Sequence, residues 1–133
     1  MIELHGWLTI YETYEDEDAF SQDTLDVIRH KVEVIVSESG NDIEIKYKNG
    51  VPFINTLLCS NHRTKEIDDI IEIYKNIAQI ATGSYGVIYL RDDEDSKHSN
   101  EFQIYLFKHG NCIYRLDNDF SPCIPTIEEK MSK

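Results

Sequence analysis

Two pairs of metal-binding side chains are the first candidates for chemistry in this chain. Cys59 and His62 form a C-x2-H pair, and His109 and Cys112 form an H-x2-C pair. Thiolates and imidazoles are ligands that Zn²⁺ prefers, so four of them can enclose an ion. The spacing matches no common finger or ribbon, and no orienting group for Cys-His catalysis is identifiable. We expect no metal, cofactor or catalytic residue and keep a metal-binding or enzymatic protein as an alternative.

A run of four adjacent acids, Asp92, Asp93, Glu94 and Asp95, follows a predicted strand. The run does not fit a calcium loop, because glycine is missing from the sixth position and glutamate from the twelfth. Acid–base catalysis is also disfavoured, since neighbouring exposed carboxylates lack the different environments that separate two pKa values. Adjacent carboxylates repel one another, so we interpret the run as a binding loop for a positively charged partner.

The acid excess extends over the whole chain. A second acidic run lies nearer the N-terminus and comprises Glu15, Asp16, Glu17 and Asp18. In total, 25 acidic side chains stand against 13 basic ones, which gives a formal charge of −12. Such a field repels nucleic acids and anionic membranes and attracts a basic protein surface. We therefore expect a protein partner, with no nucleic acid and no membrane.

Hydrophobic periodicity predicts the elements that carry these residues. Alternation indicates strands over 2–14, 43–48, 51–58, 85–91, 101–108 and 112–116, and three- and four-residue spacing indicates helices over 24–38 and from Thr64 to Gly83. Asn49-Gly50 and Gly110-Asn111 are the predicted hairpin turns. Thr64 is expected to cap the second helix and Gly83 to end it. The tail from about residue 117 should be irregular, because it contains Pro122 and Pro125.

The order βαββαβββ predicts an α+β fold in one domain over 1–133, with an antiparallel-rich sheet of about six strands and both helices on one face. We assign to the helix-covered side the aliphatic positions Leu4, Leu8, Ile10, Ile88, Leu90, Phe102, Ile104 and Leu106. The opposite side then carries Trp7, Tyr11, Tyr85, Tyr89, Tyr105 and Phe107. Such an aromatic face has the composition of an interface core, and Tyr85, Tyr89 and Tyr105 are its expected anchors.

Two other interpretations of the aromatic face remain open. The segment 120–125 can fold back over it, or two copies of the chain can pack face to face as a homodimer. We expect Trp7 itself to be largely buried against a neighbouring backbone. No stretch approaches the ~20 apolar residues that span a bilayer, and three widely spaced cysteines suit reduced thiols, so we expect a cytoplasmic protein.

Three segments carry a resemblance to a known family: His5-Gly6-Trp7, Gly83 through Asp95, and Asp119 through Glu128. Together they resemble the immunity protein 7 family of bacterial polymorphic toxin systems. The resemblance implies a small cytoplasmic α+β protein, encoded beside a secreted toxin, that binds and neutralises the toxin domain in the producing cell. It supplies no map of binding residues.

Charge and resemblance together predict a non-enzymatic immunity protein that neutralises a cognate toxin by stoichiometric occlusion. Enzymes that act on nucleic acids tend to be basic, so an acidic inhibitor suits a nuclease-like toxin. The alternatives are the metal-binding or enzymatic protein above and a generic interaction module that dimerises through its aromatic face.

Overall fold

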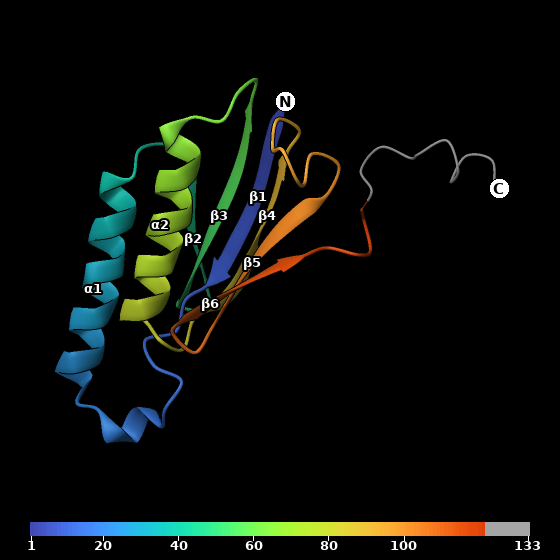
Figure 1. Cartoon of the computed structure of the whole chain (residues 1–133). Helices are drawn as coiled ribbons and strands as arrows, with labels where there is room; N and C mark the ends of the chain where they lie inside the picture. The colour runs from blue at the N-terminus through green and yellow to red at the C-terminus, as the bar shows by residue number, and fades with distance from the viewer. Residues whose placement is uncertain (122–133) are drawn as a thin grey trace.

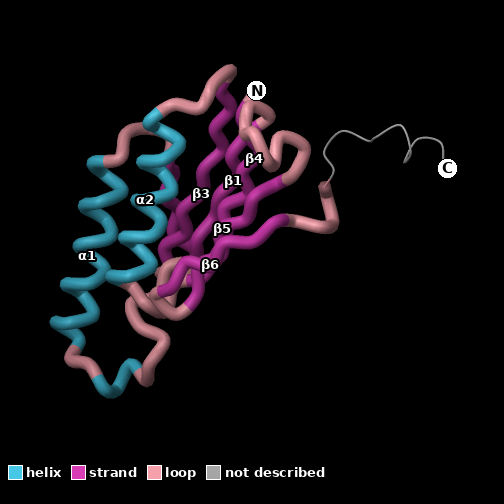
Figure 2. Tube along the Cα trace, in the orientation of Figure 1, coloured by secondary structure: helices cyan, strands magenta, loops and turns pink. Residues whose placement is uncertain are grey.

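The fold was described from a computed structural model, which describes residues 1–121 apart from the side chain of Glu17. The elements are β1 (Ile2–Thr9), the short 3-10 helix η1 (Glu17–Ala19), α1 (Gln22–Glu38), β2 (Ile43–Lys48), β3 (Val51–Ser60), α2 (Lys65–Ile80), β4 (Tyr85–Asp92), β5 (Phe102–Lys108) and β6 (Asn111–Leu116). The strands form one antiparallel sheet in the order β2-β3-β1-β4-β5-β6. Both helices lie on the same side of this sheet (Figures 1 and 2). The predicted α+β class and element order are confirmed.

The two β-hairpins have tight two-residue turns. Asn49 and Gly50 take φ angles of 51° and 78°, as the first predicted turn requires. The second turn consists of His109 and Gly110, with φ angles of 50° and 78°, and Asn111 already begins β6. The prediction of Gly110-Asn111 was therefore wrong by one residue, because His109 adopts the left-handed conformation that we had assigned to Asn111.

Several predicted element ends differ from the structure. β1 stops at Thr9 instead of residue 14, because the chain then leaves the sheet after Ile10 has donated a hydrogen bond to Pro52 (3.0 Å). Thr64 is the N-cap residue of α2, as predicted, but its side chain makes no capping hydrogen bond. α2 ends at Ile80, before Gly83. Gly83 instead allows the backbone of Thr13 to approach closely, since a Cβ at position 83 would lie 2.4 Å from the carbonyl oxygen of Thr13.

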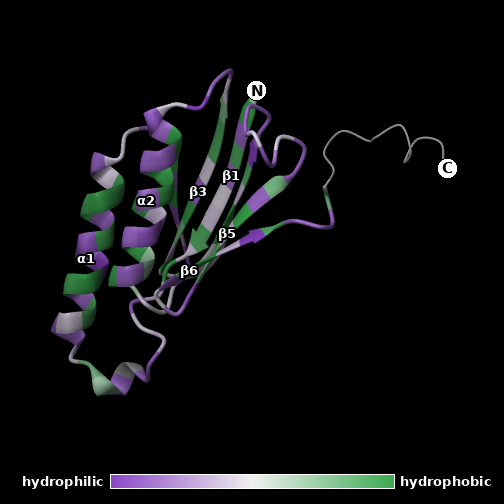
Figure 3. Cartoon of the chain, viewed as in Figure 1, coloured by the Kyte–Doolittle hydropathy of each residue, from purple (hydrophilic) through white to green (hydrophobic). Residues whose placement is uncertain are grey.

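The hydrophobic core lies between the sheet and the two helices (Figure 3). Tyr74 of α2 is fully buried in its centre, and its hydroxyl hydrogen-bonds to that of Thr56 at 2.8 Å. Gly6 provides the space, because a Cβ there would lie 3.0 Å from the Tyr74 hydroxyl oxygen. Gly6 therefore makes room on the sheet for the ring of Tyr74 from α2.

The predicted face assignment was right for β1 and β4 but inverted for β5. Ile88 of β4 pairs with Tyr105, and Gly86 pairs with Phe107, so these two aromatic side chains point toward the helices. Phe107 is buried, and Tyr105 packs against the core. Phe102, Ile104 and Leu106 consequently lie on the other side. Both sides of β5 are apolar, so only its pairing with β4 decides which one faces the helices.

Candidate protein-binding surface

The sheet side that faces away from the helices is the candidate binding surface, and we call it the open face. Strand registers and side-chain alternation place on it Glu3, His5, Trp7, Glu44, Lys46, Lys48, Phe53, Asn55, Leu57, Cys59, Tyr85, Val87, Tyr89, Arg91, Phe102, Ile104, Leu106, Lys108, Ile113 and Arg115. No element of the described chain covers this side (Figures 1 and 2). The open face therefore combines large apolar side chains with scattered charges.

Three aromatic rings meet where β1 ends and β4 begins. The Trp7 and Tyr85 ring centroids lie 6.3 Å apart edge to face, and Tyr11 stacks on Tyr85 at 6.2 Å. Trp7 is 44% exposed and Tyr85 47%. The expectation that Trp7 is largely buried was wrong, because its strand position directs the ring away from the core. Rigid, half-exposed rings of this kind are typical anchors of protein interfaces.

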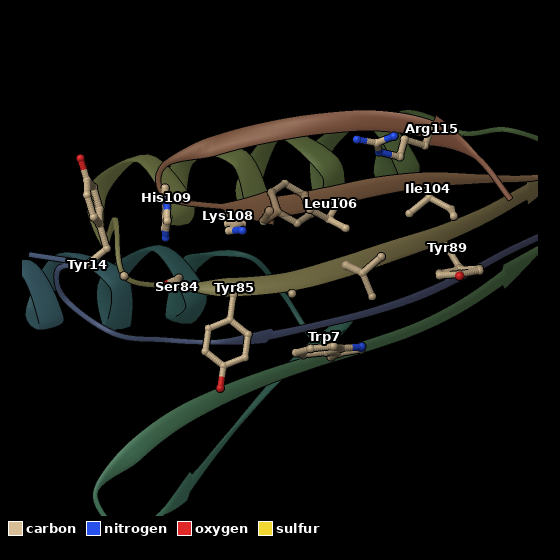
Figure 4. A pocket seen from close by; sticks show the side chains of 14 residues that line it. Trp7, Tyr14, Ser84, Tyr85, Tyr89, Ile104, Leu106, Lys108, His109 and Arg115 are labelled. Atoms are coloured by element: carbon tan, nitrogen blue, oxygen red, sulfur yellow. The ribbon is translucent and has the colours of Figure 1, made fainter.

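A shallow groove of about 540 Å³ continues from these rings across the open face. Trp7, Tyr85 and Tyr89 line one part of it, and Ile104, Leu106 and Arg115 line another (Figure 4). At one end, Tyr14 and His109 stack with their ring centroids 4.8 Å apart. The groove is mainly apolar and offers a cationic group at its β6 side.

A second aromatic group joins the open face to the start of the tail. The Tyr89 ring lies 5.7 Å from that of Phe102 and 6.0 Å from that of Phe120. Buried Asp117 fixes this turn by accepting hydrogen bonds from the backbone N–H groups of Phe120 (2.7 Å) and Ser121 (3.0 Å). Phe120 thus reaches one end of the open face, while 122–125, the rest of the segment considered as a cover, lies outside the described residues.

The acidic run after β4 differs from the predicted exposed loop. Asp92 is buried on the helix-covered side, with its carboxylate 3.5 Å from Arg63 and accepting a hydrogen bond from the Glu94 N–H at 3.0 Å. The strand alternation continues one residue further than expected and directs Asp92 inward. Its assignment as an exposed contact residue was therefore wrong.

The other three acids of the run are exposed or half-buried, and each has a partner within the chain. Asp93 accepts a hydrogen bond from the N-terminal ammonium at 2.5 Å, which lowers the pKa of this carboxyl. Glu94 lies 2.6 Å from the His62 ring. Asp95 accepts hydrogen bonds from the N–H groups of Lys97 and His98, both at 2.9 Å, and these lower its pKa. The run thus closes one end of the fold through contacts within the chain.

The other acidic run lies at the opposite end of the sheet. β1 begins beside Asp92 and ends beside Tyr85, and Glu15, Asp16 and Asp18 follow its end in an exposed segment. The structure therefore does not bring the two runs together. They flank the open face from its two ends.

The charge of the open face itself is not acidic. It carries Lys46, Lys48, Arg91, Lys108 and Arg115 against Glu3 and Glu44. The acid excess therefore resides on the helices and loops around this surface.

Leu57 and Ile113 are among the apolar members of the surface that sequence reasoning missed. Leu57 is 66% exposed, and the alternation of Ile54 and Thr56 toward the core contained the signal for it. Ile113 had no such signal, because its side of the sheet follows from its pairing with β5, whose two sides are both apolar.

The two Cys/His pairs lie at opposite ends of the sheet. Cys59 pairs with Glu3 near the start of β1, whereas His109 and Cys112 flank the β5–β6 turn beyond Tyr85. No group of three or more His, Cys, Asp or Glu residues within 1–121 is placed to hold a metal. Burial raises the pKa of the Cys112 thiol, which disfavours the reactive thiolate. The four residues do not form one site.

Comparisons with known proteins identify the family. None of the helices described here is both long and apolar enough to cross a membrane. No curated protein and no solved structure matched the chain. The model of the immunity protein 7 family matches residues 1–129 of the 133. The chain therefore belongs to the immunity protein 7 family and is an immunity protein of a toxin system.

Proposed function

We propose that this immunity protein neutralises its toxin by binding one copy of a basic toxin domain over the open face, in the cytoplasm of the producing cell. The observation that carries the proposal is the uncovered aromatic group of Trp7, Tyr11 and Tyr85, which continues into an apolar groove. Exposed apolar surfaces of this extent are uncommon on monomeric proteins unless a partner covers them.

Affinity in this arrangement comes from the rings, because desolvated aromatic side chains at an interface centre dominate truncation scans. Trp7, Tyr85 and Tyr89 stand on the two central strands β1 and β4, so the fold holds their backbones rigid. Tyr105 is not part of this set, since it faces the helices. A rigid aromatic platform loses little conformational entropy on binding.

The net charge favours a basic toxin, and a toxin that acts on nucleic acids is the class that most often carries a basic surface. The exposed acids Glu15, Asp16 and Asp18 lie at one end of the open face, and Asp93 lies at the other. The cations Arg91 and Arg115 on the face itself suit carboxylates or backbone carbonyls of the toxin. Covering the toxin surface that receives its substrate would then block the reaction.

The test combines the purified chain with the toxin domain encoded beside its gene. We expect a 1:1 complex and complete inhibition at one equivalent. Trp7→Ala and Tyr85→Ala should each weaken the complex by about 2 kcal/mol or more. Val27→Ala is the matched control, because Val27 is 53% exposed on α1 and lies away from the open face. Inhibition that survives the double variant Trp7→Ala/Tyr85→Ala unchanged would refute the proposed surface, and a homodimer that dissociates with the same variant would assign the face to a second copy.

A further inference from the structure

Within residues 1–121, the edge strand β6 is a second surface without a partner. β6 pairs with β5 on one side only, and no strand of the described chain lies on its other side. An edge strand presents unpaired N–H and C=O groups that can add a strand from another chain. The question is which backbone groups are free and what kind of chain fits them.

The turn geometry identifies the free groups. A two-residue turn makes Lys108 and Asn111 a hydrogen-bonded pair, and such pairs then alternate along the hairpin. The hydrogen bond from the Asp117 N–H to the Phe102 carbonyl at 3.0 Å continues the same alternation. The backbone N–H and C=O groups of Cys112, Tyr114 and Leu116 consequently point away from β5.

The opposite edge of the sheet is protected in a way that β6 is not. β2 carries Glu44, Lys46 and Lys48 within six residues, and charges of this kind discourage strand addition. Its Tyr47 is held by α1, because the hydroxyl donates to Glu33 at 2.5 Å and the Arg29 guanidinium lies 5.7 Å from the ring centre. β6 has the same length but a single charge, Arg115, and both Ile113 and Tyr114 are exposed.

Charge decides between a toxin segment and a second copy of this chain. On the helix-covered side, burial and the neighbouring Tyr105 raise the pKa of Tyr114, the carboxylates of Asp95 and Glu101 add to this, and the Arg63 guanidinium opposes it. A basic side chain added beside Tyr114 would lie in the field of these two carboxylates, which outnumber the single cation Arg63. A second copy would bring a further −12 of charge, with only one cation in its own β6. The edge therefore suits an extended basic segment better than it suits itself.

We propose that the toxin domain adds an extended segment to β6 as a seventh strand, with basic side chains directed toward Asp95 and Glu101 and alternate apolar ones toward the groove beside Arg115. This inference rests on the proposed function and specifies how the toxin engages the molecule. Main-chain hydrogen bonds along β6 then add to the aromatic contacts of the open face.

Substitution at Tyr114 separates backbone from side-chain contributions. Tyr114→Ala keeps the outward N–H and removes the ring, whereas Tyr114→Pro removes the N–H as well. Proline is tolerated on an edge strand when the missing N–H has no partner in the sheet. We expect Tyr114→Pro to raise the Kd for the toxin domain encoded beside the gene at least about 10-fold above that of Tyr114→Ala. Equal Kd values for two folded variants would overturn the inference.

Amide hydrogen exchange on the unaltered protein keeps the inference testable if the proline variant fails to fold. The N–H groups of Cys112, Tyr114 and Leu116 should exchange fast in the free protein and at least about 100-fold more slowly in the toxin complex. Unchanged exchange in a 1:1 complex that still depends on Trp7 would overturn strand addition and leave the proposed function standing. Failure of the unaltered protein to form any complex with the toxin domain would instead contradict the proposed function. Concentration-dependent protection in the free protein would assign the edge to a second copy and overturn the inference.

Discussion

Gly86 leaves room on β4 for the backbone of the neighbouring strand β1. A Cβ at this position would lie 2.1 Å from the carbonyl oxygen of Trp7, a distance that no side chain accommodates without moving the strand. At Gly6, by contrast, the nearest obstacle is the movable ring of Tyr74 at 3.0 Å. Gly86 therefore governs the approach of β4 to β1, and Gly6 governs the approach of α2 to the sheet.

We predict that Gly86→Ala destabilises the fold by about 3 kcal/mol or more and that Gly6→Ala costs less, about 1–3 kcal/mol. Gly86→Ala should cost more because its new Cβ would clash with the backbone of β1, which cannot move without disrupting the sheet. At Gly6 the clash is with a side chain, which can shift. Urea unfolding of both variants measures the difference. Equal losses would show that β1 and β4 separate more easily than the structure implies.

Tyr74 is the residue through which alkaline pH should act on stability. Burial raises the pKa of its hydroxyl to about 12, against an ordinary value near 10, and the hydrogen bond from Thr56 only partly opposes this. Because the folded pKa is the higher one, the fold favours the neutral phenol. The contribution is complete below pH 10 and is lost as pH rises toward 12, by about 2–3 kcal/mol in all.

The matched variant is Tyr74→Phe, which keeps the ring and cannot ionise. At pH 8 it should be less stable than the wild type by about 1–2 kcal/mol, because the buried Thr56 hydroxyl loses its partner. Between pH 10 and 12 the wild type should lose this advantage and become the less stable of the two. Parallel pH curves for the two proteins would contradict the assignment of the alkaline effect to Tyr74.

At the scale of elements, an ion pair joins two loops that are remote in sequence. Arg63 precedes α2 and contacts Asp68 of that helix at 2.5 Å and Asp92 at the end of β4 at 3.5 Å. It therefore links the start of α2 to the end of a central strand. The hydrogen bond to Asp68 raises the pKa of Arg63 further, so the guanidinium stays charged over the accessible pH range.

We predict that Asp92→Asn lowers the free energy of unfolding by about 1–3 kcal/mol, because the buried site loses a charge-assisted partner for Arg63. Glu94→Gln is the control, since Glu94 pairs with His62 at the exposed surface and should change stability by no more than about 0.5 kcal/mol. If the control loses as much as Asp92→Asn, the assigned difference between the buried and the exposed acid is wrong.

The sequence was informative about elements where the signal is local. Asn49-Gly50 demands positive φ angles, and alternation in β1 and β4 identifies the buried side by contrast with polar or aromatic neighbours. β5 lacks this contrast, because Phe102, Ile104 and Leu106 are as apolar as the opposite side. The open face was therefore predictable as an aromatic surface, but its β5 and β6 members depend on pairing across strands.

The burial of Asp92 could not be predicted for a similar reason. Its partner Arg63 lies 29 residues earlier, on a different loop, and only the folded chain brings the two together. The sequence alone therefore predicted that the acidic run is a binding loop for a positively charged partner. The two acidic runs also lie at opposite ends of the sheet, a separation that strand order and direction determine together.

For the whole molecule, charge and aromatic anchoring should affect different steps of binding. With −12 on the chain, association with a basic toxin should reach ~10⁷ M⁻¹s⁻¹ or more at low salt and slow markedly as the Debye length falls below ~10 Å. Trp7→Ala should raise the dissociation rate and leave the salt dependence of association unchanged, since it removes no charge. Stopped-flow association across a salt series measures both. A salt-independent association rate would contradict electrostatic steering.

The most direct measurement of the central claim uses the single tryptophan of the chain. Trp7 is 44% exposed at the centre of the open face, so 5-fluorotryptophan incorporated biosynthetically gives one ¹⁹F resonance that reports on this surface. On titration with the toxin domain, we expect a shifted resonance that saturates at one equivalent and loses its H₂O/D₂O solvent-isotope shift, because the partner excludes water from the ring. A toxin that is fully inhibited at one equivalent while the Trp7 resonance keeps its position and its solvent-isotope shift would contradict binding at the open face.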